Sequence, residues 1–200
     1  MVLVDREEYR TMPSTSFQIN PEYGHITELV PGLYISGVPI VRSLASIPRI
    51  KLWLDDTPST NIYQYFDLIS DQIEAVITSG GNVLVHCVAG VSRSASVCLA
   101  FLTKFRCKSL RQAYQFMAQK RPLVRPNIGF WRQLIIYENE LKNGVVSVKL
   151  LRNKDDPENV LPDVYPSTNA DSYGERRFSR DKPKFQPILE TVPESTEAGA

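Results

Sequence analysis

The sequence predicts an α/β fold with a central, mostly parallel sheet flanked by helices. Two apolar strand patterns, Ile50–Leu54 and Val83–Val85, are separated by a helical pattern over residues 61–79. This order is typical of a strand–helix–strand unit with parallel strands. Three more helical patterns follow, and their apolar faces are expected to cover the sheet. The 200 residues, 42% of them hydrophobic, fit one globular domain with terminal segments.

Composition divides the chain into four parts. Residues 1–24 are polar and lack periodicity, so we expect a flexible N-terminal arm. The domain then spans residues 25–143. Residues 144–166 are expected to form an extension that packs on the domain, with a candidate edge strand over Val145–Leu151. Residues 167–200 are polar and contain prolines, which predicts a disordered tail.

The expected strands differ in pattern. Ile26–Leu29 and Leu33–Ile35 flank Pro31-Gly32, which predicts two short strands around a turn. Ile50–Leu54 alternates and ends in two aspartates, whereas Val83–Val85 is a continuous apolar run. Such a run is typical of a strand that is buried on both faces.

Apolar residues at helical spacing predict the helix between these strands: Ile62, Phe66, Ile69, Ile73 and Val76. Gly80-Gly81 is its expected stop. The later helical patterns cover residues 94–105, 109–121 and 127–141. Ser109 opens a capping-box pattern and Asn127 follows a proline, so both are expected N-caps.

The chemistry of the chain is concentrated in residues 86–94. Five residues, among them Gly90, separate Cys87 from Arg93. Their backbone N–H groups can turn inward as an anion-binding nest, and the following helix adds the positive end of its dipole. These groups favour the thiolate form of Cys87, and Arg93 offers a planar fork for two phosphoryl oxygens. The loop therefore predicts a phosphate site with a nucleophile at its base.

A carboxylate is expected on the same rim as this loop. The carboxyl ends of parallel strands meet at one edge of a sheet, and both Cys87 and the pair Asp55-Asp56 follow such ends. A carboxyl group there can protonate a leaving oxygen. Alternation along the strand does not decide between Asp55 and Asp56, because the pattern ends where the loop begins.

These residues resemble a small dual-specificity protein phosphatase of the cysteine-based protein tyrosine phosphatase superfamily. The resemblance rests on residues 86–94, the upstream aspartate, Arg121-Pro122 and Pro126-Asn127, and it covers residues 25 to about 143. A Cys-x5-Arg signature alone occurs in several unrelated folds, but the Gly-x-Ser-Arg-Ser ending is far more specific. The chain is similar to the atypical members without a kinase-docking domain, and Asn159–Tyr165 resembles a C-terminal extension of some of them.

The resemblance implies a reaction without metal or cofactor, in which Cys87 attacks phosphorus and forms a phosphocysteine that water hydrolyses. Arg93 and the amides of the loop hold the phosphoryl oxygens; the loop residues are Val88, Ala89, Gly90, Val91, Ser92 and Arg93. Ser94 is expected to offer its hydroxyl to the sulfur and His86 to orient the loop. Asp56 is preferred over Asp55 as the acid, because it stands ten residues before Phe66 in the register of the family.

The substrate class follows from the same loop. Phosphoinositide phosphatases of this superfamily tend to carry lysines there, whereas this loop is neutral between Cys87 and Arg93, so we expect phosphorylated proteins as substrates. No long insertion deepens the cleft, which implies action on phosphotyrosine and on phosphoserine or phosphothreonine. The main alternative is a module that binds phosphoproteins with poor turnover, and a less favoured one is an RNA or inositide phosphatase.

Composition indicates few other partners. The net charge of +1 does not favour nucleic acid or a membrane surface, and no long uncharged apolar run predicts a membrane span. Three cysteines without a secretory leader predict a reducing compartment, the cytoplasm or the nucleus. The oligomeric state is not predicted.

One segment departs from the resemblance. Between Tyr34 and Asp56 the family has a helix and another parallel strand, and this chain is about 20 residues short there, which corresponds to one short helix and one strand. We therefore expect one helix and one central strand to be missing and the chain to be marginally stable. Two interpretations remain. The catalytic motifs stand on an incomplete fold, which we favour, or the chain is a compact variant that tolerates the shorter segment.

Other chemically interesting residues have structural interpretations. Cys98 lies in an apolar helix and is expected to pack in the core, and Cys107 to be an incidental thiol. His25 is expected at the surface. Trp53 and Trp131 are expected as packing anchors. Arg125 and Asn127 can brace the phosphate loop, and the alternative for Asn127 is that it only caps a helix. Ser179, which follows Arg176-Arg177 and Phe178, is a weak hypothesis for a kinase site.

Overall fold

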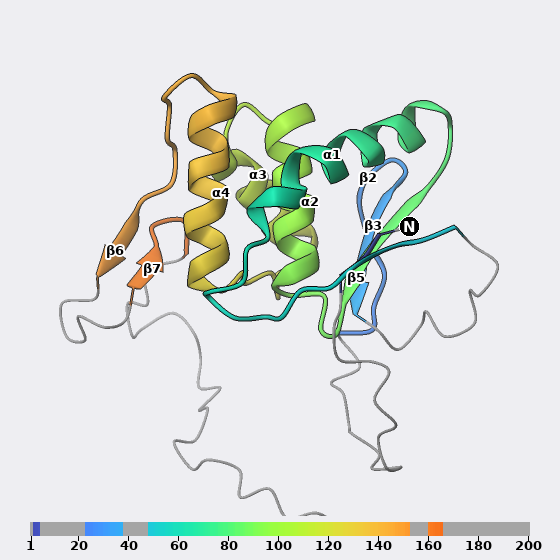
Figure 1. Ribbon diagram of the computed structural model, residues 1–200, viewed down its shortest axis with the longest axis horizontal. Helices are drawn as coiled ribbons and strands as arrows, with labels where there is room; N and C mark the ends of the chain where they lie inside the picture. The colour runs from blue at the N-terminus through green and yellow to red at the C-terminus, as the bar shows by residue number, and fades with distance from the viewer. Residues whose placement is uncertain (1, 5–22, 38–47, 153–159, 166–200) are drawn as a thin grey trace, which may run out of the picture. The chain divides into compact units, whose positions relative to one another are not determined.

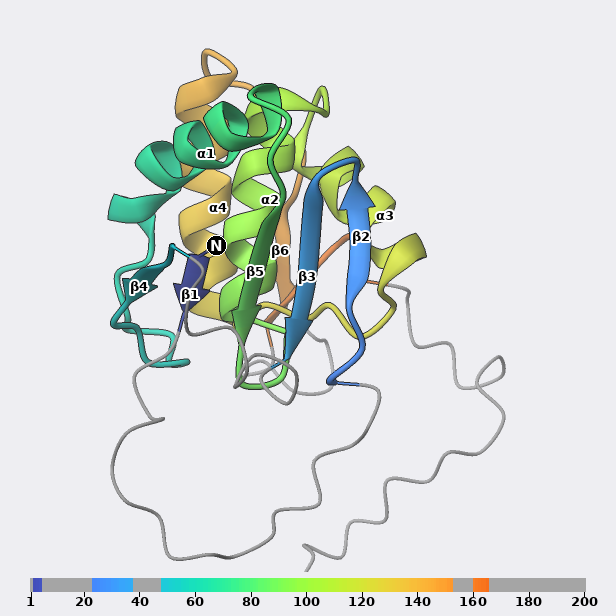
Figure 2. The same ribbon diagram turned by 90° about the vertical axis from the view of Figure 1, so that its right-hand side faces the viewer.

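The computed structural model describes residues 2–4, 23–37, 48–152 and 160–165 (Figures 1 and 2). The expected tail over residues 167–200, with Ser179, lies outside the described residues. The described ranges contain one sheet of five strands, four helices and a separate pair of strands. The predicted α/β class is confirmed.

The five-stranded sheet has the order β2-β3-β5-β1-β4. Its strands are β1 (Val2–Val4), β2 (Thr27–Val30), β3 (Leu33–Gly37), β4 (Ile50–Leu52) and β5 (Val83–Cys87). Only β2 runs antiparallel to its neighbour, and Figure 2 shows the sheet face-on. The turn between β2 and β3 needs Gly32, whose φ is +84°. The predicted hairpin and the mostly parallel sheet are both confirmed.

The strand β1 corrects the expected N-terminal arm. Val2–Val4 pairs in parallel with β5 on one side and with β4 on the other, so it lies inside the sheet. The rest of the expected arm up to residue 22, and residues 38–47, lie outside the described residues. The position at which we expected a missing strand is thus filled by residues from far earlier in the chain.

The described ranges contain four helices: α1 (Tyr63–Thr78), α2 (Arg93–Phe105), α3 (Leu110–Lys120) and α4 (Ile128–Leu141). The first three pack against the sheet, and α4 packs on the other helices. The helix α2 is central, because it packs on the other three helices and on β3 and β5. In Figure 2, α2, α3 and α4 lie behind the sheet. Every residue from Arg93 to Thr103 is buried, so the expected core packing of Cys98 is confirmed. Burial raises the pKa of the Cys98 thiol.

Sequence signals at the helix ends largely agree with the structure. Ser109 Oγ accepts a hydrogen bond from the Gln112 amide at 3.2 Å, and Asn127 Oδ1 accepts one from the Phe130 amide at 3.0 Å, so both predicted caps are confirmed. The α1 helix stops before Gly80, whose φ is +81°. Val76 is 38% exposed, and its predicted place on the buried face is therefore wrong.

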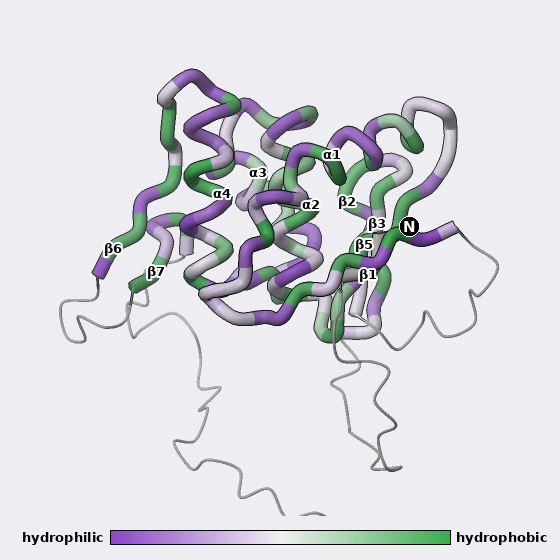
Figure 3. The backbone as a smooth tube through the Cα atoms, viewed as in Figure 1, coloured by the Kyte–Doolittle hydropathy of each residue, from purple (hydrophilic) through white to green (hydrophobic). Residues whose placement is uncertain are grey.

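The two tryptophans have opposite environments. Trp131 on α4 is fully buried, as predicted for a packing anchor. Trp53 is 59% exposed and lies under Lys51 Nζ at 3.9 Å. The anchor prediction for Trp53 is wrong because it follows β4, which is the edge strand of the sheet. Figure 3 shows the hydrophobic run along the more central strand β5, which does supply core residues.

The residues after α4 form a layer of their own. The strands β6 (Leu150–Arg152) and β7 (Val160–Pro162) make a separate antiparallel pair, so the expected edge strand of the main sheet is wrong. Hydrogen bonds hold this segment to Arg111 on α3, which donates to Ser147 O at 2.9 Å and to Asp163 Oδ2 at 2.7 Å. Buried Glu138 accepts hydrogen bonds from Ser147 as well.

An aromatic contact joins this layer to α4. Trp131 Nε1 donates to Tyr165 Oη at 2.8 Å, and the two rings meet edge to face. Burial raises the pKa of Tyr165 to about 12. In the part of the chain that the structure describes, no helix combines the length and the apolar character needed to cross a membrane.

Candidate active site

The loop between β5 and α2 folds around the Cys87 sulfur. Cys87 ends β5 and is 1% exposed. Its Sγ accepts a hydrogen bond from the Gly90 amide at 3.2 Å and lies in hydrogen-bond contact with Ser94 Oγ, also at 3.2 Å. The Gly90 amide thus donates to the sulfur, where a donor stabilises negative charge, and the Ser94 hydroxyl in the first turn of α2 lies within hydrogen-bond distance of it.

Gly90 is required by the shape of this loop. Its φ is +67°, and a Cβ atom there would lie 2.6 Å from Ser36 C and O and from Arg121 Nη2. A side chain would thus meet backbone on one side and a guanidinium on the other. The positive φ favours glycine, and the tertiary structure also leaves no space for a side chain.

Arg121 braces the loop from behind. Its guanidinium donates to five groups: the carbonyls of Gly90, Ala89, His25 and Tyr23 and the Thr27 hydroxyl, at 2.9 to 3.4 Å. The residue is 3% exposed, and this burial lowers the pKa of the guanidinium. The loop is thereby joined to the residues that lead into β2. His25 itself is exposed, as expected.

Replacing Arg121 by lysine should lower both stability and activity. An ammonium group keeps the charge but cannot reproduce the planar fork that reaches both sides. Because buried carbonyls lose charged donors, we expect the free energy of unfolding to fall by about 3 kcal/mol. Urea unfolding of the variant measures this, with exposed Arg132→Lys on α4 as the control. Equal unfolding midpoints for the two variants would contradict the brace.

Arg93 is held by the segment that carries the acid. The residue is 6% exposed, and its Nη1 donates to Leu54 O at 3.1 Å. Its Nε lies 3.7 Å from Asp56 Oδ2. The guanidinium is thus fixed between the loop and the residues after β4.

Asp56 lies against the loop. Its side chain is 34% exposed, and Oδ1 accepts hydrogen bonds from Ser92 Oγ at 2.7 Å and from Asn127 Nδ2 at 2.8 Å. The structure therefore brings Asp56 against the loop that begins at Cys87 and ends at Arg93, although the two segments are far apart in the sequence.

Asn127 has both of the roles that the sequence left open. Its Oδ1 caps α4, while its Nδ2 holds Asp56 and its backbone N–H donates to Ser92 Oγ at 3.1 Å. Arg125 contacts the loop through its backbone, since its N–H donates to Val91 O at 2.9 Å. Its guanidinium lies over the Tyr165 ring instead, 4.8 Å from the ring centre.

The start of α4 also fixes the segment after Asp56. A Cβ atom on Gly129 would lie 2.0 Å from Pro58 O, so only glycine permits this approach. Gln133 Oε1 accepts from the amides of Ile62 and Tyr63, and its Nε2 donates to Thr60 O at 2.9 Å. Gln133 thus caps α1 from another helix. Sequence reasoning missed Gln133 because no local pattern connects it to a residue 70 positions earlier.

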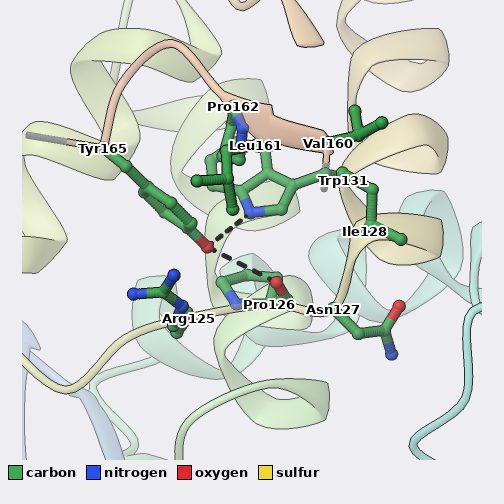
Figure 4. Close-up of a pocket in the computed structure, with 9 residues that line it drawn as sticks. All are labelled: Arg125, Pro126, Asn127, Ile128, Trp131, Val160, Leu161, Pro162 and Tyr165. Atoms are coloured by element: carbon green, nitrogen blue, oxygen red, sulfur yellow. Dashed lines mark hydrogen bonds between the residues drawn. The ribbon is translucent and has the colours of Figure 1, made fainter. Parts of the chain in front are cut away.

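A shallow hollow of about 230 Å³ borders Asn127 (Figure 4). Its lining combines the start of α4 with β7 and Tyr165: Arg125, Pro126, Asn127, Ile128, Trp131, Val160, Leu161, Pro162 and Tyr165. The strand β7 and Tyr165, which follow α4 in the sequence, therefore form one wall of the hollow next to Asn127.

Comparison with known proteins identifies related sequences. Residues 8–140 match the family model described as dual specificity phosphatase, catalytic domain. Dual specificity protein phosphatase 14 of Mus musculus is 47% identical over 116 residues, which cover 58% of this chain and 57% of that protein. Human dual specificity protein phosphatase 18 is 34% identical over 183 residues, covering 78% of this chain and 94% of the relative.

Solved structures show the same architecture. The crystal structure of human DUSP28 superposes with a TM-score of 0.55 at 26% identity and covers 58% of this chain and 95% of that chain. The crystal structure of a mouse putative dual specificity phosphatase complexed with zinc tungstate superposes with a TM-score of 0.57 at 27% identity and covers 64% of this chain and 94% of that chain. The chain spans 57% to 66% of the length of the phosphatase 14 relatives from mouse and human.

Proposed function

Because the chain belongs to the dual specificity phosphatase family, we propose that it hydrolyses phosphate monoesters on phosphotyrosine and on phosphoserine or phosphothreonine of proteins. The observation that carries the proposal is that Asp56 contacts Arg93 and Ser92 of the loop that begins at Cys87. A thiol, a planar cation and a carboxyl group are the set needed for attack, charge stabilisation and proton transfer.

In the first step the Cys87 thiolate attacks phosphorus. The P–S bond forms as the P–O bond to the leaving group breaks, and Asp56 gives its proton to the departing oxygen. Arg93 and the loop amides donate to the other phosphoryl oxygens, which carry the charge in the transition state. The contact of Arg93 with Leu54 O and Asp56 keeps the fork oriented before substrate arrives.

In the second step water replaces the sulfur. The Asp56 carboxylate takes a proton from water, the oxygen attacks phosphorus, and the P–S bond breaks to release inorganic phosphate. Ser94 donates to the leaving thiolate, and its hydroxyl already lies 3.2 Å from Sγ. Asp56 ends this step protonated and Cys87 as thiolate, so the next cycle can begin.

Replacing Asp56 by asparagine tests the acid. We expect kcat for a phenyl phosphate with a poor leaving group to fall by about 10²- to 10³-fold, because the proton donor is lost. A nitrophenyl phosphate should be less affected, since its leaving group is stable as the anion. The matched control is Asp55→Asn. An equal loss in both variants, or no dependence on the leaving group, would contradict the assignment.

The alternative of a binding module depended on misplacement of the acid relative to Cys87. The contact of Asp56 with Ser92 inside the loop removes that reason. Turnover of a phosphopeptide separates the two functions directly, because a binding module would retain the peptide without releasing phosphate.

The neutral side chains between Cys87 and Arg93 support phosphoproteins over phosphoinositides as substrates. A panel of phosphopeptides and phosphoinositides at equal concentration tests this preference by phosphate release. A thiol nucleophile works in a reducing compartment, which supports the cytoplasm or the nucleus as the location.

A further inference from the structure

The two strands that lead into the candidate active site are joined in the sheet through β1. The strand β5 ends at Cys87, and β4 ends two residues before Leu54, the carbonyl that accepts from Arg93. The sheet order places β1 between them. Since neighbouring strands lie about 4.8 Å apart, β1 separates β4 from β5 by about 10 Å.

The connection between β3 and β4 is short. Only residues 38–49 lie between the end of β3 and the start of β4. A parallel crossover alone needs about a dozen residues. The sheet order places β4 three positions beyond β3, and the strand that lies between β5 and β4 is Val2–Val4.

We propose that the slot between β5 and β4 is a strand-binding site and that its occupant is Val2–Val4 of the same chain. The register is specific: Leu3 pairs with Lys51 on one side and with His86 on the other. Valines flank Leu3, and β-branched residues favour extended backbone. The occupant holds β4, and through Leu54 and Asp56 it sets the distance between the acid and Cys87.

Loss of Val2–Val4 from this position would destabilise the sheet. Both β4 and β5 would then present unpaired N–H and C=O groups to each other within the sheet, and buried backbone groups without partners are costly. The strand β4 would also lose its only neighbour in the described sheet. Release of residues 2–4 therefore uncouples the Asp56 segment from the Cys87 loop. This device goes beyond the proposed reaction.

Hydrogen exchange of the full chain tests the slot. Leu3→Pro removes a donor in a central strand, and proline is excluded from such positions. We expect amide exchange in Ile50–Leu52 and at the carboxyl end of β5 to become at least about 10-fold faster, while α3 and α4 retain their protection. Glu7→Pro, which lies outside β1, is the matched control. Unchanged exchange in Leu3→Pro, or an equal effect of Glu7→Pro, would overturn the proposal.

A cross-link keeps the proposal testable if Leu3→Pro unfolds the protein. Directly paired residues of neighbouring strands lie within disulfide range, so Leu3→Cys with Lys51→Cys should form an intramolecular disulfide under mild oxidation. Leu3→Cys with Ile26→Cys, a residue just before β2 at the far edge, should not. Peptide mapping identifies the bond. Equal yields for the two pairs, or a bond only between two copies, would overturn the assignment to the same chain. Neither readout depends on hydrolysis.

Discussion

Replacing Cys87 by serine is expected to lower kcat/KM for an aryl phosphate by about 10⁴-fold or more, because loss of a covalent nucleophile removes most of the rate enhancement. A hydroxyl is far less ionised than a thiol at neutral pH, while the shape of the loop is retained. Release of inorganic phosphate under single-turnover conditions measures the loss.

The matched control for this variant is Cys107→Ser. Cys107 is partly exposed and lies after α2, away from the loop in sequence. If activity survives in Cys87→Ser but falls in Cys107→Ser, the assignment of Cys87 as the nucleophile is wrong. A full loss in Cys87→Ser with unchanged unfolding would attribute the effect to chemistry rather than to folding.

Replacing Arg93 by lysine should lower kcat by about 10³-fold, since removal of one well-placed donor to a developing oxyanion costs that much in other enzymes. Lysine keeps the positive charge but loses the planar fork that grips two oxygens and the bond to Leu54 O. KM should change less than kcat, because the fork acts chiefly in the transition state.

The control for Arg93 is Arg125→Lys. The Arg125 guanidinium lies over the Tyr165 ring, and the residue reaches the loop by its backbone, which the substitution leaves intact. Steady-state kinetics on one phosphopeptide compares the two variants. Similar losses would show that general positive charge, and not the bidentate geometry, determines the rate.

Local signals predicted most of the described helices and strands. The stop at Gly80 and the caps at Ser109 and Asn127 depend on residues within four positions, so sequence suffices. The errors share another cause. Trp53 and Val76 are apolar and suitably spaced, but their exposure depends on which strand is at the edge and which helix face is covered.

The candidate site likewise has one part that local sequence predicts and another that depends on contacts between distant segments. Cys87, Ser94 and the loop between them lie within one short segment, whose local geometry the sequence predicts. Asp56 required the order of strands as well, because its contacts with Ser92 and Asn127 join positions 36 and 71 residues apart. No local pattern predicted the brace by Arg121.

By itself the sequence determined the chemistry, because a thiol, a glycine-bearing turn, an arginine and a helix start are adjacent in the chain and act over a few ångströms. Only the tertiary structure decided how that chemistry is held. The placement of Val2–Val4 inside the sheet and the burial of Arg121 behind the loop depend on contacts between distant segments. Such contacts form because buried backbone groups and buried charges are costly unless they are paired, and the pairing groups can come from any part of the chain.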